Sequence, residues 1–381
     1  MIYDFLKPVS NDVIEFVNTL PNHSIGKNTV FHTEDFFPEL EGFSFALLTV
    51  NETRGNNQSK IELDFSFIRQ QFYSLFPGNW NSKLVDLGQI EAGNSVEDTY
   101  FLLKNVVADL LKNKIIPLVL GGSQDLTYAI YRGYDALEQM VNFVSIDSKI
   151  DVVSDMVNPS ESFISRIIME EPNNLYNFCN IGYQTYYNSQ EEIDLIDKMY
   201  FEAYRLGEVV NNMQITEPIL RDADVVSLDL NSVKSSDLGS FSKYNPNGFD
   251  GREICALARY SGISDRVSSF GIFNINNDFK ESLLIAQILW YFCEGFNFRM
   301  NEYPYISKIS YFKYIVPLEE QELIFYKSDR SDRWWIETEV FGDDLSTERK
   351  VLFPCSYSDY EMALSQIIPE RWWRAVKKQL V

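Results

Sequence analysis

Short apolar runs alternate with longer amphipathic segments over most of the chain. Runs of this length suit buried strands, and they lie at Phe43–Val50, Leu84–Leu87, Ile115–Leu120, residues 141–147, Phe178–Gly182, Val225–Asp229 and Val267–Phe273. Helical spacing falls between them, at Ser10–Leu20, Phe65–Phe76, Ser95–Lys112, Gln124–Leu137, Glu191–Met199, Phe201–Asn211, Asp250–Ser261 and Glu281–Phe298. Strands that alternate with helices predict βαβ units and a mainly parallel sheet covered on both faces.

The pattern changes after Tyr303. Alternating positions predict a small antiparallel sheet from Ile309–Val316, Glu322–Tyr326 and Trp334–Glu339, followed by helices at Asp359–Ile367 and Glu370–Leu380. We therefore expect an α/β domain over residues 1–303 and a C-terminal α+β extension, residues 304–381, packed on it. The extension holds four of the six tryptophans, which suit core packing or an interface: Trp334, Trp335, Trp372 and Trp373. Residues Ser232–Tyr244, rich in serine, are expected to form a mobile loop.

Composition narrows the kind of partner. The 381 residues are 45% hydrophobic and 23% charged, which is typical of a globular protein. A formal net charge of −22 argues against nucleic acid and anionic membrane surfaces. No window reaches the roughly 18 apolar residues that a membrane span needs. The start of the chain lacks a secretory signal pattern, and the four cysteines are widely spaced, so a cytoplasmic protein with reduced thiols is expected.

Four predicted strands end in distinctive polar groups. These are Gly121-Gly122-Ser123-Gln124, Asp147-Ser148-Lys149-Ile150-Asp151, Ser227-Leu228-Asp229-Leu230-Asn231 and Gly271-Ile272-Phe273-Asn274. Because open α/β sheets bind ligands beyond the carboxyl ends of their strands, these groups can converge on one crevice. Polar loops after strands are common, so only the four segments together indicate a shared site.

The order and spacing of these segments resemble the ureohydrolases, namely arginase, agmatinase and, most closely, formimidoylglutamase, over roughly residues 40–300. That family holds two manganese ions with Gly-Gly-Asp-His, Asp-Ala-His-x-Asp and Ser-x-Asp-x-Asp. Gly182-Tyr183 and Asn247-Gly248 add to the likeness. The resemblance implies an arginase-like three-layer α/β/α fold, hydrolysis of guanidino or amidine C–N bonds, and self-association into homo-oligomers.

Several family positions are changed in this chain. Asp147, Asp151 and Asp229 match ligand positions of the family, whereas the remaining ligand positions hold Gln124, Lys149 and Asn231. Asn274 stands where the family has a Glu that helps to bind substrate, and Tyr134 falls near its proton-shuttling His.

These changes remove what a two-metal site requires. The only histidines, His23 and His32, lie far from the motifs in sequence. A protonated Lys149 has no lone pair to donate and repels a divalent ion. We expect its ammonium to pair with the three aspartates in place of metal. The sequence thus predicts a pseudoenzyme with a binding, scaffolding or regulatory role, with no metal cofactor, and with a protein partner or a second copy of itself.

An alternative keeps catalysis. Asp147, Asp151, Asp229 and Asn231, with the Gln124 carbonyl nearby, form an all-oxygen set that suits one hard cation such as Mg²⁺ or Ca²⁺ if Lys149 swings away. With one such ion, or the Mn²⁺ of the family, the protein would be a divergent hydrolase of amidine or guanidino C–N bonds. Other enzyme classes fit less well, because the chain has no Gly-rich phosphate loop and no His near the motifs to activate a nucleophile.

Overall fold

The structure is a computed structural model, and it describes residues 2–56, 61–152, 158–239, 245–276, 278–304, 311–319, 321–341 and 348–378. Most of the chain surrounds a nine-stranded sheet in which all the strand pairs are parallel. In spatial order its strands are β1 (Val30–Phe31), β3 (Leu84–Glu91), β2 (Phe45–Asn51), β4 (Ile116–Gly121), β9 (Ser269–Phe273), β8 (Val225–Asp229), β5 (Val141–Ile146), β6 (Leu175–Tyr183) and β7 (Glu202–Arg205). The central strands β2, β4, β5, β8 and β9 are buried throughout, as their continuous apolar runs predict.

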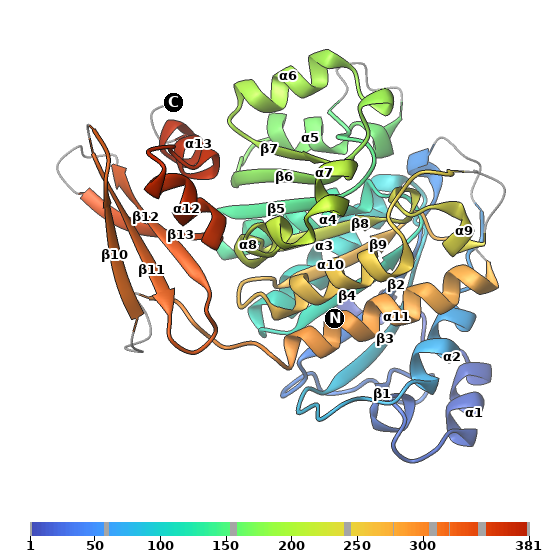
Figure 1. The fold of residues 1–381 in the computed structure, drawn as a ribbon. Coiled ribbons are helices and arrows are strands. Elements are labelled where there is room, and N and C mark those ends of the chain that lie inside the picture. The colour runs from blue at the N-terminus through green and yellow to red at the C-terminus, as the bar shows by residue number, and fades with distance from the viewer. Residues whose placement is uncertain are drawn as a thin grey trace.

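Helices cover both faces of this sheet (Figure 1). One face packs against α1 (Asn11–Thr19), α2 (Ser66–Ser74), α7 (Leu206–Asn211), α8 (Thr216–Asp222), α10 (Gly251–Ile263) and α11 (Phe279–Phe296). The other packs against α3 (Val96–Lys112), α4 (Leu126–Gly133), α5 (Phe163–Met169) and α6 (Gln190–Lys198). The predicted three-layer arginase-like fold is confirmed. Helix α3 begins with a reciprocal capping box between Ser95 and Asp98.

The C-terminal segment forms the expected antiparallel sheet. Its strands are β10 (Tyr311–Pro317), β11 (Glu322–Ser328), β12 (Trp334–Phe341) and β13 (Glu348–Cys355), followed by α12 (Tyr357–Leu364) and α13 (Glu370–Lys378). Figure 1 shows this sheet at one side of the molecule, with α13 between it and the β6–β7 edge. Arg371 on α13 pairs with Glu202 on β7 at 2.8 Å. Arg221 on α8 donates to the carbonyls of Trp334 and Cys355, both at 3.0 Å.

The described residues of the extension therefore dock at the amino end of β7 and against α8, at the end of the sheet away from the carboxyl ends of the strands. Trp334 and Trp335 are buried, and Trp372 donates to the Glu337 carbonyl, so these three serve packing. Only Trp373, at 42% exposure, keeps much surface in solvent. The division of the chain into a domain over residues 1–303 and an extension over residues 304–381 stays a prediction.

Some elements differ from the sequence prediction. Phe201–Asn211, predicted as one helix, is the edge strand β7 followed by α7, because Glu202 and its neighbours pair with β6 and face α13. The pattern also missed β13, α5 and α8. The predicted mobile loop Ser232–Tyr244 contains the short helix α9 (Ser235–Leu238), while residues 240–244 lie outside the described residues. Within the described part of the chain, no helix is long and apolar enough to cross a membrane.

Candidate functional site: a polar crevice at the strand ends

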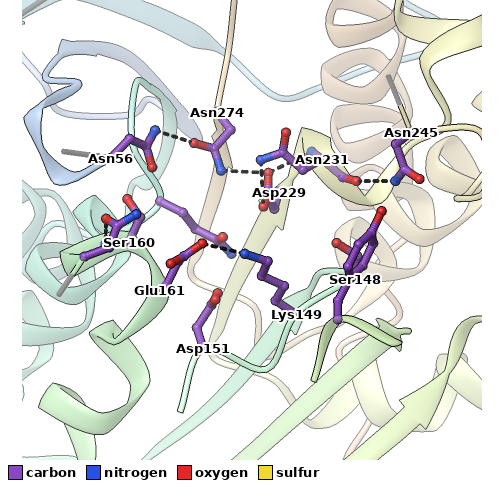
Figure 2. A pocket seen from close by; sticks show the side chains of 13 residues that line it. Asn56, Ser148, Lys149, Asp151, Ser160, Glu161, Asp229, Asn231, Asn245 and Asn274 are labelled. Carbon is purple, nitrogen blue, oxygen red and sulfur yellow. Dashed lines mark hydrogen bonds and ion pairs between the residues drawn. The ribbon is translucent and has the colours of Figure 1, made fainter. Parts of the chain in front are cut away.

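A polar crevice of about 410 Å³ opens at the carboxyl ends of the central strands. It lies where an open parallel sheet offers a ligand site. Figure 2 shows its side chains, which are mostly amides, hydroxyls and carboxylates: Asn56, Gln124, Ser148, Lys149, Asp151, Asn158, Ser160, Glu161, Tyr187, Asp229, Asn231, Asn245 and Asn274. The structure thus brings together the polar ends of all four strands that the sequence singled out.

The loop after β5 is fixed by its backbone. The Lys149 N–H donates to Asp147 Oδ1 at 2.9 Å, and Asn180 Nδ2 donates to the Lys149 carbonyl at 2.7 Å. The Ile150 N–H donates to Asn188 Oδ1 at 2.7 Å. Asp151 adopts φ +58°, a left-handed conformation in which a short polar side chain is tolerated. These contacts keep the Asp147 and Asp151 carboxylates close together at the base of the crevice.

Asp229 is the hub of an amide network. Its Oδ1 accepts from the Asn231 backbone N–H at 2.8 Å and from Asn274 Nδ2 at 2.9 Å, as Figure 2 shows. Asn274 in turn accepts from Asn56 Nδ2 at 2.9 Å, while its own N–H donates to the Gly122 carbonyl at 2.6 Å. A Cβ at Gly122 would lie 2.1 Å from the Glu52 carbonyl oxygen, so the close approach of the Gly122 and Glu52 backbones requires glycine. The network therefore orients Asp229 and presents amide groups to the crevice.

The aspartates at the base are buried beside one another. Burial, and then the negative charges of Asp229 and Asp151, raise the pKa of Asp147 well above its usual range. Burial and the charge of Asp229 raise the pKa of Asp151 to about 8. The Oδ2 atom of Asp147 is buried and has no hydrogen-bond partner among the described residues. Asp147 and Asp151 also take part in none of the ion pairs found between those residues.

Lys149 does not pair with the aspartates as predicted. Its ammonium forms an ion pair with Glu161 at 2.5 Å, in the short 3₁₀ helix Pro159–Glu161, and Figure 2 shows the side chain directed there. Both side chains are almost half exposed, at 41% and 46%, so this pair costs less desolvation than one at the buried base. Burial lowers the pKa of Lys149, but Glu161, Asp151 and Asp147 outweigh it and raise the pKa, so the ammonium stays charged. The prediction that Lys149 occupies the place of a metal is therefore wrong.

Gln124 lies at the base of the crevice, as predicted. It is 1% exposed, and its Nε2 donates to Ser145 Oγ at 3.3 Å. Neither histidine lines the crevice: His23 faces another cavity, and His32 Nδ1 contacts the Leu87 carbonyl at 3.0 Å. No imidazole is thus available to a ligand bound in the crevice.

Tyr134 does not lie in the crevice. Its hydroxyl contacts the Asp224 carbonyl at 3.1 Å and the hydroxyls of Ser268 and Ser269 at 2.7 and 2.9 Å, at the amino ends of β8 and β9. Helix α4 starts beside the crevice at Leu126 and leads away from it. Since a helix rises about 1.5 Å per residue, a residue two turns later reaches the opposite end of the sheet. Placing Tyr134 near a proton-shuttling position was therefore wrong.

Several lining residues were missed by the sequence prediction. Asn56 follows β2 and obeys the same strand-end rule as Asn274, so that rule could have found it. Glu161, Ser160 and Asn158 come from a short helical turn that Asn158 caps and Pro159 begins, and this start signal could have found it. Ser160 is placed by Asp125, whose Oδ1 accepts from its hydroxyl at 2.8 Å.

The donor set decides which metal the crevice suits. Two ions do not fit, because a charged ammonium and two amides stand where a two-metal site needs anionic or imidazole ligands. One hard cation fits the chemistry better, since Asp147 offers a buried oxygen that lacks a partner and Asp151 and Asp229 lie nearby. No three His, Cys, Asp or Glu side chains of the described residues converge as a ready metal cluster. Binding would therefore draw these carboxylates together.

The geometry defines an α/β protein with a polar crevice at the carboxyl edge of a parallel sheet. The sequence profile of the Arginase family matches residues 64–293, which is more than half of the chain. This protein belongs to the arginase family. Formimidoylglutamase from Geobacillus sp. (strain WCH70) is 24% identical over 221 residues, spanning 55% of this chain and 68% of that protein.

Solved structures show the same fold. Formimidoylglutamase from Bacillus subtilis superposes with a TM-score of 0.64 at 16% identity, covering 73% of this chain and 93% of that one. Formiminoglutamase from Trypanosoma cruzi, solved with Mn²⁺, gives 0.61 at 18%, covering 69% and 97%. The resemblance to ureohydrolases is confirmed, and these relatives favour the hydrolase alternative over the non-catalytic prediction.

Proposed function

We propose that this protein is a divergent hydrolase of amidine or guanidino C–N bonds that uses one hard divalent cation. The observation that carries the proposal is the buried Asp147 Oδ2, which has no partner among the described residues although two more carboxylates lie nearby. A buried carboxylate oxygen without a partner is costly. One cation held by Asp147, Asp151 and Asp229 would remove that cost.

The remaining groups suit a cationic amidine. Such a substrate carries several N–H donors on a planar carbon, and Glu161, together with the amide carbonyls of Asn56 and Asn245, can accept from them at the mouth of the crevice. The preset Asn56–Asn274–Asp229 chain holds part of this acceptor surface before a ligand arrives. In the reaction, water adds to the amidine carbon and its C–N bond breaks, with a proton passing to the departing nitrogen. When bound, the cation would supply electrostatic polarisation of the attacking water or of the substrate.

A non-catalytic role is the second candidate. It is favoured by the ammonium and the amides at ligand positions, and by the lack of a preformed metal cluster among the described residues. In this role the crevice would bind a ligand or a protein partner without turning it over. Homo-oligomer formation stays a prediction.

Thermal unfolding with and without Mn²⁺, Mg²⁺ and Ca²⁺, together with metal content after dialysis, tests the cation. A ligand that binds only the folded state adds about 2.7 kcal/mol of stability at one hundred times its Kd, so the Tm should rise by several degrees. Asp147→Asn should abolish the shift. The matched control Asp332→Asn, at an aspartate whose side chain is 83% exposed, should keep it.

Release of ammonia or amine from formiminoglutamate, agmatine and arginine then tests catalysis with the metal-loaded protein. Hydrolysis that disappears in Asp147→Asn supports the proposed activity. Cation binding without hydrolysis of any of the three would favour the non-catalytic candidate. A Tm that no cation moves would show that the crevice is not a metal site.

A further inference from the structure

A second and larger cavity lies at the other end of the sheet. Its volume is about 750 Å³, against about 410 Å³ for the crevice. It is formed beside the first residues of β2 and β3, Phe45 and Leu84, with α2 and α11 completing its wall. Its size falls within the range of small-molecule sites. It shares no lining residue with the crevice.

The inner wall of this cavity is apolar and aromatic. Phe45, Phe72 and Cys293 line it and are at most 1% exposed. Burial raises the pKa of the Cys293 thiol far above its usual range, so that group acts as an apolar surface. Aromatic walls of this kind favour a flat aromatic ligand, through apolar burial and edge or offset ring contacts.

Two adjacent tryptophans provide an internal contrast. Trp80 and Trp290 have ring centroids 5.6 Å apart. The Trp290 N–H donates to the Phe76 carbonyl at 2.8 Å. Trp80 lines the cavity, and its Nε1 is buried without any acceptor among the described residues. A buried indole N–H normally finds a partner, so this donor is suited to an acceptor atom on a ligand.

The rim supplies positive charge and is held in place. Lys83 is exposed on the cavity lining and joins none of the ion pairs found between described residues. The Asn81 and Ser82 N–H groups donate to Asn297 Oδ1 at 3.0 and 3.3 Å, which fixes the loop before Lys83. In a chain with a net charge of −22, a cation without a described counter-ion beside an apolar cavity favours an anionic group on the ligand.

We propose that this cavity binds a planar aromatic carboxylate whose ring system carries a hydrogen-bond acceptor. The ring lies in the cavity beside Trp80, its acceptor atom takes the Trp80 N–H, and its carboxylate faces Lys83. Each of these three contacts corresponds to one feature of the cavity, namely the aromatic wall, the Trp80 N–H without a described acceptor, and the Lys83 cation at the rim.

A matched set of probes separates the three contacts. Quinoline-6-carboxylate has all the proposed features, 2-naphthoate lacks the ring acceptor, and 6-(hydroxymethyl)quinoline lacks the charge. Calorimetric titration of the full chain should give the tightest binding for quinoline-6-carboxylate, by about fivefold or more over each of the other two. Fluorine NMR of protein labelled with 5-fluorotryptophan should show a saturable shift of the Trp80 signal, assigned by its loss in Trp80→Phe.

Variants test the donor and the cation separately. Trp80→Phe keeps a ring but removes the N–H, so the preference for quinoline-6-carboxylate over 2-naphthoate should disappear while 2-naphthoate still binds. Lys83→Met should weaken quinoline-6-carboxylate about fivefold and leave 6-(hydroxymethyl)quinoline unchanged. Lys112→Met, an exposed lysine on α3, is the control and should change neither. Equal affinity for the three probes, or a Trp80 signal that stays still at about 1 mM probe, would overturn the proposal.

Discussion

Buried acids occur at the crevice and at the junction with the C-terminal extension, and the two places treat them differently. At the junction, burial alone would raise the pKa of Glu202, but Arg371, Asn177 and Tyr204 outweigh it and hold the pKa below its usual value. At the crevice, Asp147 and Asp151 have raised pKa values, and the nearby lysine pairs elsewhere. At the junction this chain supplies the buried acid with a cation, whereas at the crevice none of the described residues does so. The difference agrees with the proposal that the crevice acids receive a cation from outside.

The largest expected effect tests the junction. Arg371→Met leaves Glu202 buried without its ion-pair partner, so the free energy of unfolding should fall by about 3–5 kcal/mol. Urea unfolding at pH 7 measures it. Lys7→Met is the control, because its pair with Glu91 is exposed and its loss should cost less than about 1 kcal/mol. Adding Glu202→Gln to Arg371→Met should restore part of the loss. If the two single variants lose equal stability, the contrast between the two regions fails.

Glu281 on α11 is a further buried acid with no cation partner in the described part of the chain, and its effect on stability can be tested by changing the pH. It accepts from the Asn276 N–H at 2.6 Å, no cation pairs with it among the described residues, and burial raises its pKa to about 8. Between pH 4.5 and 8 the folded state keeps a proton that the unfolded state has lost. The contribution of Glu281 to stability is therefore complete below pH 4.5 and decreases as the pH rises to 8.

Glu281→Gln should remove this pH dependence. The unfolding free energy of the wild type minus that of the variant should decrease by about 2–4 kcal/mol from pH 4.5 to pH 8.5, because the wild type loses stability as Glu281 ionises. Chemical unfolding at several pH values measures it, and Glu253→Gln in a solvent-accessible capping box serves for comparison. Parallel pH curves for wild type and Glu281→Gln would contradict the raised pKa.

A smaller effect is expected at Tyr134, whose hydroxyl belongs to the amino ends of β8 and β9. Tyr134→Phe removes its hydrogen bonds to Ser268, Ser269 and the Asp224 carbonyl, so stability should fall by about 1–2 kcal/mol. Cation affinity at the crevice should stay unchanged, as measured by the Tm shift with Mg²⁺. A large drop in that shift would place Tyr134 functionally in the crevice after all.

The smallest stability effect is expected for Lys149→Met. Its pair with Glu161 is nearly half exposed, so stability should change by less than about 1 kcal/mol. The variant removes a positive charge near Asp147 and Asp151, and Mg²⁺ or Mn²⁺ affinity should rise about three- to thirtyfold. Lys104→Met, which breaks an ion pair with Asp135 away from the crevice, is the matched control and should leave affinity unaltered. Weaker cation binding in Lys149→Met would indicate that the lysine supports the site.

Much of the fold could be predicted from the local pattern of apolar and polar residues. Period and length predicted the parallel strands and most helices, and the strand-end rule brought Gln124, Asp147, Asp151, Asp229, Asn231 and Asn274 to one edge of the sheet. Strands, helices and strand-end residues could be predicted because they depend on neighbouring residues in the sequence and on the common direction of parallel strands. Both can be read from one sequence. The family resemblance depended on the same residues.

Contacts between distant segments decided the rest. Lys149 could have paired with any of four acids, and only the position of the turn at Pro159–Glu161 directs it to Glu161. Tyr134 was misplaced because a helix leads away from the crevice, and β7 was taken for a helix because its pairing with β6 and its contact with α13 are absent from local spacing. The cavity at the amino ends of β2 and β3 left no motif at all. The sequence pattern thus determined which residues lie at each end of the sheet. Packing determined which charged groups form pairs there, because electrostatic interactions depend on distances in space.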